Sequence, residues 1–233
     1  MSHRGHVVAS LVALGALVAG CGGETTSDPT QGVAAPPATS VAPVTSARSE
    51  QSTTTITTVT SAPATPGCRR ITQFDGASDD WVVVNDGVMG GRSAGIVDVV
   101  DSTMRFTGNV VTAGGGFTSV RRMLDGDELV GTERIVLRVR ADDRTYGLTL
   151  EDASRSGRRP VAHGADLVIE PVTDADGWNT VELAYERLEP TVFGQPIDAD
   201  AFDPDTASEI GIIIADGQDG GFELTVDWID ACR

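Results

Sequence analysis

Apolar and polar side chains alternate with a period of two along much of residues 68–233. The clearest alternation runs through residues 135–140, 146–151, 181–185 and 222–228. Because successive side chains of a strand point to opposite faces, each of these segments predicts a strand with one buried and one solvated face. In the last segment the same alternation places Trp228 on the buried face, together with Phe222, Leu224 and Val226.

A continuous apolar run at residues 210–215 is bounded by Glu209 and by Asp216-Gly217. This pattern is typical of a central strand covered on both sides. Turn-forming pairs such as Asp125-Gly126 separate the segments, and no segment carries an apolar stripe of helical period over three turns. Many short strands joined by turns predict an all-β fold, an antiparallel β-sandwich or jelly roll.

The N-terminus has the features of an export signal. Arg4 precedes an apolar run over residues 7–19, which is shorter than the roughly 20 residues that span a bilayer. Residues 17–21, Leu-Val-Ala-Gly-Cys, resemble the bacterial lipobox, and this implies a lipid on Cys21 after removal of residues 1–20. The alternative is an ordinary signal peptide with a chance cysteine. We therefore expect a lipoprotein, anchored in the cell membrane on its extracytoplasmic face.

Residues 21–67 are dominated by Thr, Ser, Ala, Pro and Val, and we expect them to form a disordered tether. Residues 68–233 are then one globular domain. Its two cysteines, Cys68 and Cys232, stand at the first and penultimate positions. In an oxidising compartment such a pair predicts a disulfide, and two free thiols are the alternative.

The formal net charge is −17, and all 17 basic residues are arginine. Such an acidic chain repels phosphate backbones, so we expect no nucleic-acid partner. It also repels anionic lipid, so we expect membrane attachment through the lipid anchor only. Without lysine there is neither Schiff-base chemistry nor a phosphate-binding P-loop, and no G-x-G-x-x-G opens a helix. We expect no nucleotide and no other cofactor.

Catalytic and metal-binding residues are few. His163 is the one histidine after residue 20, so a zinc site of the His/Cys type is excluded, and no G-x-S-x-G accompanies it for a Ser–His–Asp triad. The aspartates at 198, 200, 203 and 205 have oxygen ligands for Ca²⁺ but lack the glycine and terminal glutamate of an EF-hand loop. We expect no metal and no enzymatic activity.

The segment 85–93 is the best candidate for a binding surface. It offers polar side chains at Asn85, Asp86, Arg92 and Ser93, and its glycines at 87, 90 and 91 allow close backbone approach or a positive φ. The alternative is a structural loop, in which Asn85 and Asp86 satisfy their own turn and Met89 plugs the end of the sandwich.

Arg121 and Arg140 are further candidates, on the polar faces of predicted strands. There a guanidinium can clamp a carboxylate or stack on a ring. The alternative is a structural ion pair across the sheet with Glu223 or Asp227.

One string of residues carries a family resemblance. Residues 81–93 read W-V-V-V-N-D-G-V-M-G-G-R-S, and G-G-F-T-S-V-R follows at residues 115–121. In this order the two motifs resemble the family of the mitochondrial complex I intermediate-associated protein, over about residues 74–229. The resemblance implies a galactose-binding-like jelly roll, an architecture shared by many carbohydrate-binding modules. The mitochondrial members are assembly factors for the respiratory NADH dehydrogenase, whose peripheral arm an exported bacterial chain would not meet.

These observations favour a non-catalytic binding module tethered to the cell envelope, whose ligand is a protein or a glycan. Sugar platforms need exposed flat rings, whereas the chain has three Trp, two Tyr and six Phe, mostly at inward positions. This scarcity favours a protein partner. The alternatives are an assembly or scaffolding factor for an exported or membrane complex, by family analogy, and a surface hydrolase that uses two carboxylates.

Overall fold

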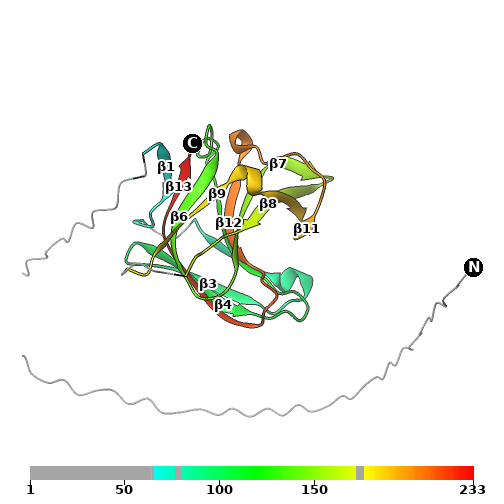
Figure 1. Cartoon of the computed structure of the whole chain (residues 1–233). Coiled ribbons are helices and arrows are strands. Elements are labelled where there is room, and N and C mark those ends of the chain that lie inside the picture. Colours follow the sequence, from blue (N-terminus) through cyan, green and yellow to red (C-terminus); the bar gives the residue numbers. More distant parts are fainter. Residues whose placement is uncertain (1–63, 65, 77–79, 172–175) are drawn as a thin grey trace, which may run out of the picture. The chain divides into compact units, whose positions relative to one another are not determined.

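The computed structural model describes residues 64, 66–76, 80–171 and 176–233. The predicted signal peptide, Cys21 and nearly all of the tether lie outside these residues. The described residues form strands and three short 3₁₀ helices: η1 (Asp86–Met89), η2 (Tyr185–Arg187) and η3 (Pro204–Thr206). Within this part of the chain no helix is long and apolar enough to cross a membrane. The prediction of an all-β sandwich is confirmed (Figure 1).

The strands form two antiparallel sheets. The six-stranded sheet has the order β3 (Ala94–Val100), β4 (Thr103–Val110), β13 (Gly220–Cys232), β6 (Arg134–Ala141), β9 (Asn179–Ala184), and β1 (Cys68–Thr72) pairs with the end of β13. The seven-stranded sheet has the order β11 (Gln195–Pro196), β10 (Glu189–Val192), β8 (Arg159–Asp166), β7 (Tyr146–Ser156), β12 (Glu209–Ile214), β5 (Thr118–Met123), β2 (Val82–Asn85).

The core lies between the inner faces of the two sheets. With the exception of Trp228, each strand that the alternation predicts buries its apolar set, and the central strand β12 lies between β7 and β5 as expected. Among the residues with almost no exposed surface are Ile135, Leu137, Val139, Tyr146, Leu148, Leu150, Ile210, Ile212, Ile214, Leu224 and Val226. The rings of Phe106 and Phe222 meet edge to face, 4.9 Å apart, inside this core.

The predicted burial of Trp228 in the core is wrong. The pairing of β13 with β6 shifts register between Val226 and Trp228, which is a β-bulge. Because a bulge adds one residue to one strand, it reverses the alternation that follows it. Ile229 and Ala231 therefore continue the buried face, whereas Trp228 turns outward, with the guanidinium of Arg70 stacked 5.0 Å from its ring centre.

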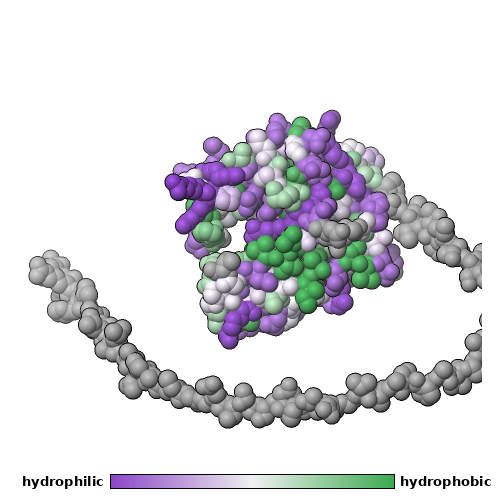
Figure 2. All heavy atoms as spheres, turned by 180° about the vertical axis from the view of Figure 1, so that it is seen from behind, coloured by the Kyte–Doolittle hydropathy of each residue, from purple (hydrophilic) through white to green (hydrophobic). Residues whose placement is uncertain are grey.

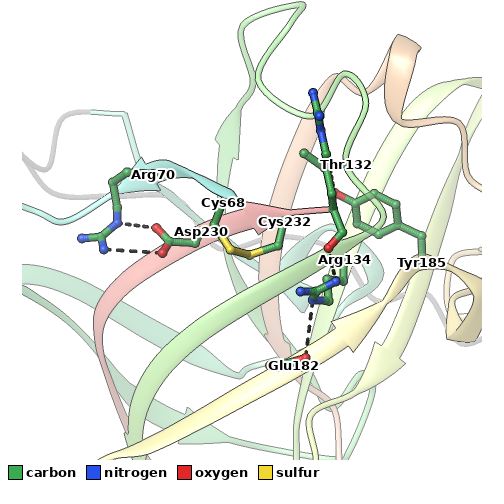
Figure 3. Close-up of a disulfide and its surroundings, with 9 residues drawn as sticks. Cys68, Arg70, Thr132, Arg134, Glu182, Tyr185, Asp230 and Cys232 are labelled. Atoms are coloured by element: carbon green, nitrogen blue, oxygen red, sulfur yellow. Dashed lines mark hydrogen bonds and ion pairs between the residues drawn. A yellow bond between two sulfur atoms is a disulfide. The ribbon is translucent and has the colours of Figure 1, made fainter. Parts of the chain in front are cut away.

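The ends of the domain are joined at β1 and β13. Cys68 and Cys232 face each other in the register of these strands and form a disulfide, so the predicted bond is confirmed. Arg70 on β1 forms an ion pair with the buried carboxylate of Asp230 beside it (Figure 3). The disulfide spans a sequence separation of 164 residues.

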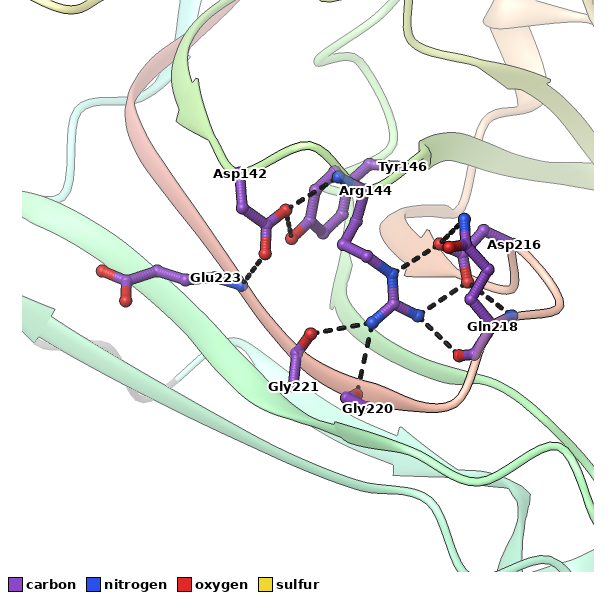
Figure 4. A network of polar contacts seen from close by, with 8 residues as sticks. All are labelled: Asp142, Arg144, Tyr146, Asp216, Gln218, Gly220, Gly221 and Glu223. Carbon is purple, nitrogen blue, oxygen red and sulfur yellow. Dashed lines mark hydrogen bonds and ion pairs between the residues drawn. The ribbon is translucent and has the colours of Figure 1, made fainter.

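At another edge of the sandwich, Arg144 connects the β6–β7 turn to the β12–β13 loop. Its guanidinium donates to both carboxylate oxygens of Asp216, at 2.6 and 2.8 Å, and to the carbonyl oxygens of Gln218 and Gly221, each at 2.7 Å (Figure 4). The pKa of Asp216 is lowered, chiefly by these hydrogen bonds from Arg144. A bidentate pair with so little exposed surface fixes both loops.

Some large apolar side chains remain on the surface. Those exposed among the described residues are Val82, Met89, Ile96, Val100, Met123, Val130, Val168 and Phe193. Figure 2 shows apolar side chains gathered on one face of the domain and bordered by polar ones.

Replacing Cys68 and Cys232 together by Ala should reduce the free energy of unfolding by up to about 5 kcal/mol, because the disulfide limits the entropy of a very long unfolded loop. Urea denaturation with and without reductant measures this difference. The oxidised wild type should resist thiol alkylation at both positions. A variant as stable as the oxidised wild type would show that strand pairing alone holds the two ends.

Candidate functional site

Asp86 is at the centre of the first candidate segment, and its side chain has no exposed surface. One carboxylate oxygen accepts a hydrogen bond from the Ser93 amide at 3.0 Å. The other accepts from the Ser93 hydroxyl and from the Gly116 amide, both at 2.7 Å, and from the Phe117 amide at 3.4 Å. Every partner is a donor, so the site is built for an ionised carboxylate.

The glycines of both motifs leave the space that this carboxylate occupies. A Cβ at Gly91 or at Gly115 would overlap the Asp86 side chain. Gly90, by contrast, has a φ of +85° where it ends η1, a conformation that favours glycine. Of the two predicted uses of glycine, close approach therefore applies to Gly91 and a positive φ to its neighbour Gly90.

The pKa of Asp86 reflects two opposing effects. Burial disfavours the charged form and by itself would raise the pKa, but the hydrogen bonds from Gly116, Ser93 and Phe117 outweigh it and hold the pKa below its usual value. The carboxylate is therefore ionised at neutral pH, and its charge stabilises the native state.

The other polar residues of segment 85–93 have different surroundings. The Asn85 side-chain oxygen accepts from the Gly95 amide at 3.0 Å and from the Thr118 hydroxyl at 2.6 Å. Ser93 is buried against Asp86, whereas Arg92 is exposed. The suggestion that Met89 plugs the end of the sandwich is wrong, because its side chain is 57% exposed. Of the four polar candidates, Arg92 alone presents its side chain to solvent.

Arg140 lies on the outer face of the six-stranded sheet. Its guanidinium stacks 4.2 Å from the ring centre of Trp178 and donates to the carbonyl oxygen of Asp176 at 2.6 Å. Arg138 stacks on the same ring from 4.8 Å. With two guanidinium groups against Trp178, that ring is not a free platform for a sugar.

The alternative of a structural ion pair across the sheet named the wrong partners, because neither candidate arginine pairs with Glu223 or Asp227. Glu223 accepts from Arg105 at 3.0 Å, and Asp227 forms an ion pair with Arg138. The alternation gives the correct faces for these side chains, but the partners depend on the order of strands in the sheet.

Arg121 lies on the outer face of the seven-stranded sheet, between two carboxylates. Its Nε donates to the Ser119 hydroxyl at 3.0 Å. Its Nη1 is 3.2 Å from Glu209 Oε1 and 3.9 Å from Glu151 Oε1. Glu209 and Glu151 are directly opposite each other on β12 and β7, so three adjacent strands contribute one charged residue each.

Small residues form the floor beneath these charges. A Cβ at Gly211 would lie 2.7 Å from the Thr149 hydroxyl and 3.2 Å from Cγ of Arg121, so glycine lets both side chains approach across β12. Along the same face a cavity of about 310 Å³ is lined by Thr145, Gly147, Asp166, Ile213, Ala215 and Asp216. The charged residues and this cavity lie toward opposite ends of the outer face of β12, and we call this outer face, with the cavity at one end, the sheet groove.

Burial raises the pKa of Glu151, and the charge of Glu209 across the strand pair raises it further, while Arg121 acts in the opposite direction. The sheet groove therefore holds a carboxylate that accepts a proton more readily than an exposed one, beside a fixed cation.

His163 has a structural position. Both its side chain and that of Asp152 are fully buried, with His163 Nε2 3.4 Å from Asp152 Oδ2, and the same oxygen of Asp152 accepts from the Asp203 amide at 2.9 Å. A buried pair cannot contact a substrate. In the acidic segment 198–205, Asp203 caps η3 by accepting from the Asp205 amide at 3.0 Å. The described residues contain no group of three or more His, Cys, Asp or Glu suited to a metal ion.

Sequence comparison identifies the family. The profile of the complex I intermediate-associated protein 30 (CIA30) family matches residues 72–226, which include both glycine motifs and the Asp86 site. The chain belongs to the CIA30 family. A comparison with curated proteins returned no match.

Solved structures share the fold of this CIA30 domain. The family 11 carbohydrate-binding module of a cellulosomal cellulase from Clostridium thermocellum aligns with a TM-score of 0.53 and 15% identity, over 72% of this chain and 95% of the module. A second structure of the Clostridium thermocellum module, in complex with a β-1,3-1,4-mixed-linked tetrasaccharide, aligns with a TM-score of 0.52 and 16% identity, over 71% of this chain and 95% of the module. At this identity the likeness establishes the β-sandwich fold.

Sequence reasoning missed Glu151 and Glu209 as partners of Arg121. The alternation in residues 146–151 does place Glu151 on a polar face. The alternation does not show that β7 pairs with β12 and β12 with β5. The pairing of β7 with β12 brings Glu151 and Glu209, 58 positions apart in sequence, onto neighbouring strands. Gly211 had a visible signal, as a glycine inside an apolar run.

Replacing Asp86 by Asn should reduce the free energy of unfolding by roughly 2–4 kcal/mol, because an amide nitrogen would face donors that the carboxylate accepts from. Chemical denaturation measures the loss, with Asp98→Asn on the exposed face of β3 as control. Since the native pKa of Asp86 is depressed, its contribution is complete above the unfolded-state pKa and disappears as the pH falls through the native pKa. Below about pH 4 the wild type should therefore lose stability more steeply than Asp86→Asn.

Comparing Gly91→Ala with Gly87→Ala tests whether Gly91 is required because a side chain there would overlap Asp86. A Cβ at Gly91 overlaps Asp86, whereas one at Gly87 has no atom within 4 Å, and neither glycine has a positive φ. We expect Gly91→Ala to be destabilised by roughly 2 kcal/mol or more and Gly87→Ala to be close to neutral. Equal melting temperatures for the two variants would contradict this account.

Proposed function

We propose that this domain is a non-catalytic binding module of the cell envelope, and that it takes a glycan in the sheet groove. The observation that carries the proposal is the set of polar groups on one open face: Arg121 held beside Glu209 and Glu151, over a floor of glycine and threonine. The family 11 module, which shares the fold and has been captured with a tetrasaccharide, supports the class of ligand.

The sheet groove matches the chemistry of a sugar. Each hydroxyl of a sugar both donates and accepts hydrogen bonds. A guanidinium beside two carboxylates offers both donors and acceptors at neighbouring positions of the sheet. Val82, directly across from Arg121, and Met123 are 60% and 68% exposed on the same face. They offer apolar contact to the C–H faces of a sugar ring, so recognition here does not require a free aromatic ring.

Binding suits this arrangement better than hydrolysis. A glycosidase places the scissile bond between its two carboxyl groups. Here Nη1 of Arg121 is within 4 Å of both Glu209 and Glu151, in the place that such a bond would occupy.

The cellular setting rests on the N-terminal sequence. A signal peptide, a lipidated Cys21 and the tether up to residue 67 would hold the domain near the extracytoplasmic face of the membrane, among envelope polysaccharides. The disulfide between Cys68 and Cys232 suits an oxidising compartment.

Arg121→Lys tests the proposal. Lysine keeps the charge but not the planar fork, so glycan affinity should fall about tenfold while the melting temperature stays within a few degrees. Calorimetric titration with the mixed-linkage tetrasaccharide and with fragments of envelope polysaccharides measures affinity. Arg105→Lys, on the outer face of the other sheet, is the matched control.

The proposal would be overturned if none of these glycans bound the unsubstituted domain, or if Arg105→Lys lost as much glycan affinity as Arg121→Lys. Release of reducing ends from a bound glycan would show a hydrolase instead. Retention of an envelope protein that Arg121→Lys no longer retains, without any glycan binding, would assign the sheet groove to a protein partner.

A further inference from the structure

One corner of the domain is basic, although the chain is acidic. Arg155, Arg158 and Arg159 lie at the turn between β7 and β8 and are all exposed. The pairing of β7 with β12 ends at Glu151, so the hairpin continues beyond its neighbour in the sheet. The three arginines are therefore carried on a two-stranded tip (Figure 1).

The arginines of this tip have no ion-pair partner within the described part of the chain, and only Arg155 senses a nearby carboxylate, that of Glu151. None of the three arginines forms an ion pair with a described carboxylate, whereas seven of the other twelve described arginines do: Arg70, Arg105, Arg121, Arg122, Arg134, Arg138 and Arg144. Among the described residues, Arg155 donates to the carbonyl oxygens of Asp152 and Ser154, at 3.1 and 2.9 Å. With 34 acidic and 17 basic residues in the chain, unpaired arginines at one tip are a local reversal of charge.

A second hairpin tip lies beside the first. Phe193, at the turn between β10 and β11, is 68% exposed, and the guanidinium of Arg159 stacks 4.7 Å from its ring centre. Phe193 has a φ of +52°, in the left-handed region that turns of this kind reserve for asparagine or glycine. The phenylalanine thus strains the backbone and buries little of its ring, so apart from the stacking of Arg159 the fold gains little from this side chain.

We propose that the two hairpin tips, Arg155, Arg158, Arg159 and Phe193, form a docking surface for an anionic phospholipid bilayer. Planar guanidinium groups bind phosphate oxygens in pairs, which suits lipid headgroups. An exposed aromatic ring between them enters the boundary between headgroups and acyl chains.

The shape and charge of the surface favour a bilayer over an acidic peptide. A peptide is bound in a groove or along a strand edge, whereas two protruding tips fit a flat partner. The net charge of −17 predicts repulsion from anionic lipid, but a charge is screened beyond about 10 Å at 0.1 M salt. A bilayer in contact with the tips therefore senses the arginines more strongly than charges that lie farther from it than this screening length.

Flotation with lipid vesicles tests the proposal, with the full chain carrying Cys21→Ser so that no lipid is attached at that position. The vesicles are equimolar phosphatidylglycerol and phosphatidylcholine, or phosphatidylcholine alone. We expect binding to the anionic vesicles alone, weakened at 0.5 M salt. Arg155→Ser, Arg158→Ser and Arg159→Ser together should lower the vesicle partition coefficient about a hundredfold, since each arginine contributes about fivefold.

The matched control is the triple variant Arg92→Ser, Arg105→Ser and Arg187→Ser. It removes the same number of exposed arginines elsewhere, so its net charge equals that of the tip variant. It should partition as the unsubstituted chain does. Equal partition of the two triple variants, or equal binding to both kinds of vesicle, would overturn the proposal, as would binding of a poly-glutamate peptide in the absence of any vesicle binding.

Phe193→Asn separates a docking role from a structural one. Asparagine tolerates the left-handed conformation, so the melting temperature should rise or stay level while partition onto anionic vesicles falls several-fold. Val100→Ser, another exposed apolar position at 55%, should leave partition unchanged. A Phe193→Asn variant that partitions like the unsubstituted chain would remove the ring from the docking surface.

Discussion

The passage of the chain from one sheet to the other depends on one buried charge. β2 belongs to the seven-stranded sheet and β3 to the six-stranded sheet, and Asp86 lies in the short connection between them. Its carboxylate binds donors just before β3 and just before β5, so it ties the connection to both sheets. A buried carboxylate stabilises only when donors surround it. That requirement explains why Gly91 and Gly115, in motifs far apart in sequence, both lack a side chain beside it.

Much of the fold was predictable because burial on one face of a strand imposes a period of two. The segments containing Leu137 and Leu148 bury all the residues that the alternation selects, and the segment containing Leu224 buries them up to Val226. The prediction failed at Trp228, because a bulge is set by the pairing of β13 with β6 and leaves no mark in the local pattern. The order of strands in each sheet is likewise not visible in the local pattern, since it depends on contacts between segments far apart in the sequence. The disulfide was predictable because only two cysteines remained after Cys21.

The candidate site was predictable only in part, for a related reason. A sequence shows which residue types are available, but not whether a polar group is turned toward a ligand or toward its own backbone. In the motif 85–93, Asp86 and Arg92 are both polar residues in the sequence, and only the structure shows that Asp86 is buried and Arg92 exposed. Arg121 was recognised as a polar residue on a strand face. Its carboxylate partners, Glu151 and Glu209, emerge only from the order β7, β12, β5.

The distribution of arginine separates structure from function in this chain. The chain has twice as many acidic as basic residues, and seven of the fifteen described arginines form an ion pair with a carboxylate of the domain. Arg144 illustrates the outcome, since five hydrogen bonds to Asp216 and nearby carbonyls engage its whole guanidinium. An exposed arginine that forms no such pair among so many acids adds little to stability, because isolated surface charges contribute little to folding. The net charge therefore describes the average surface, and the exceptions to it are the places where a partner of opposite charge can be recognised.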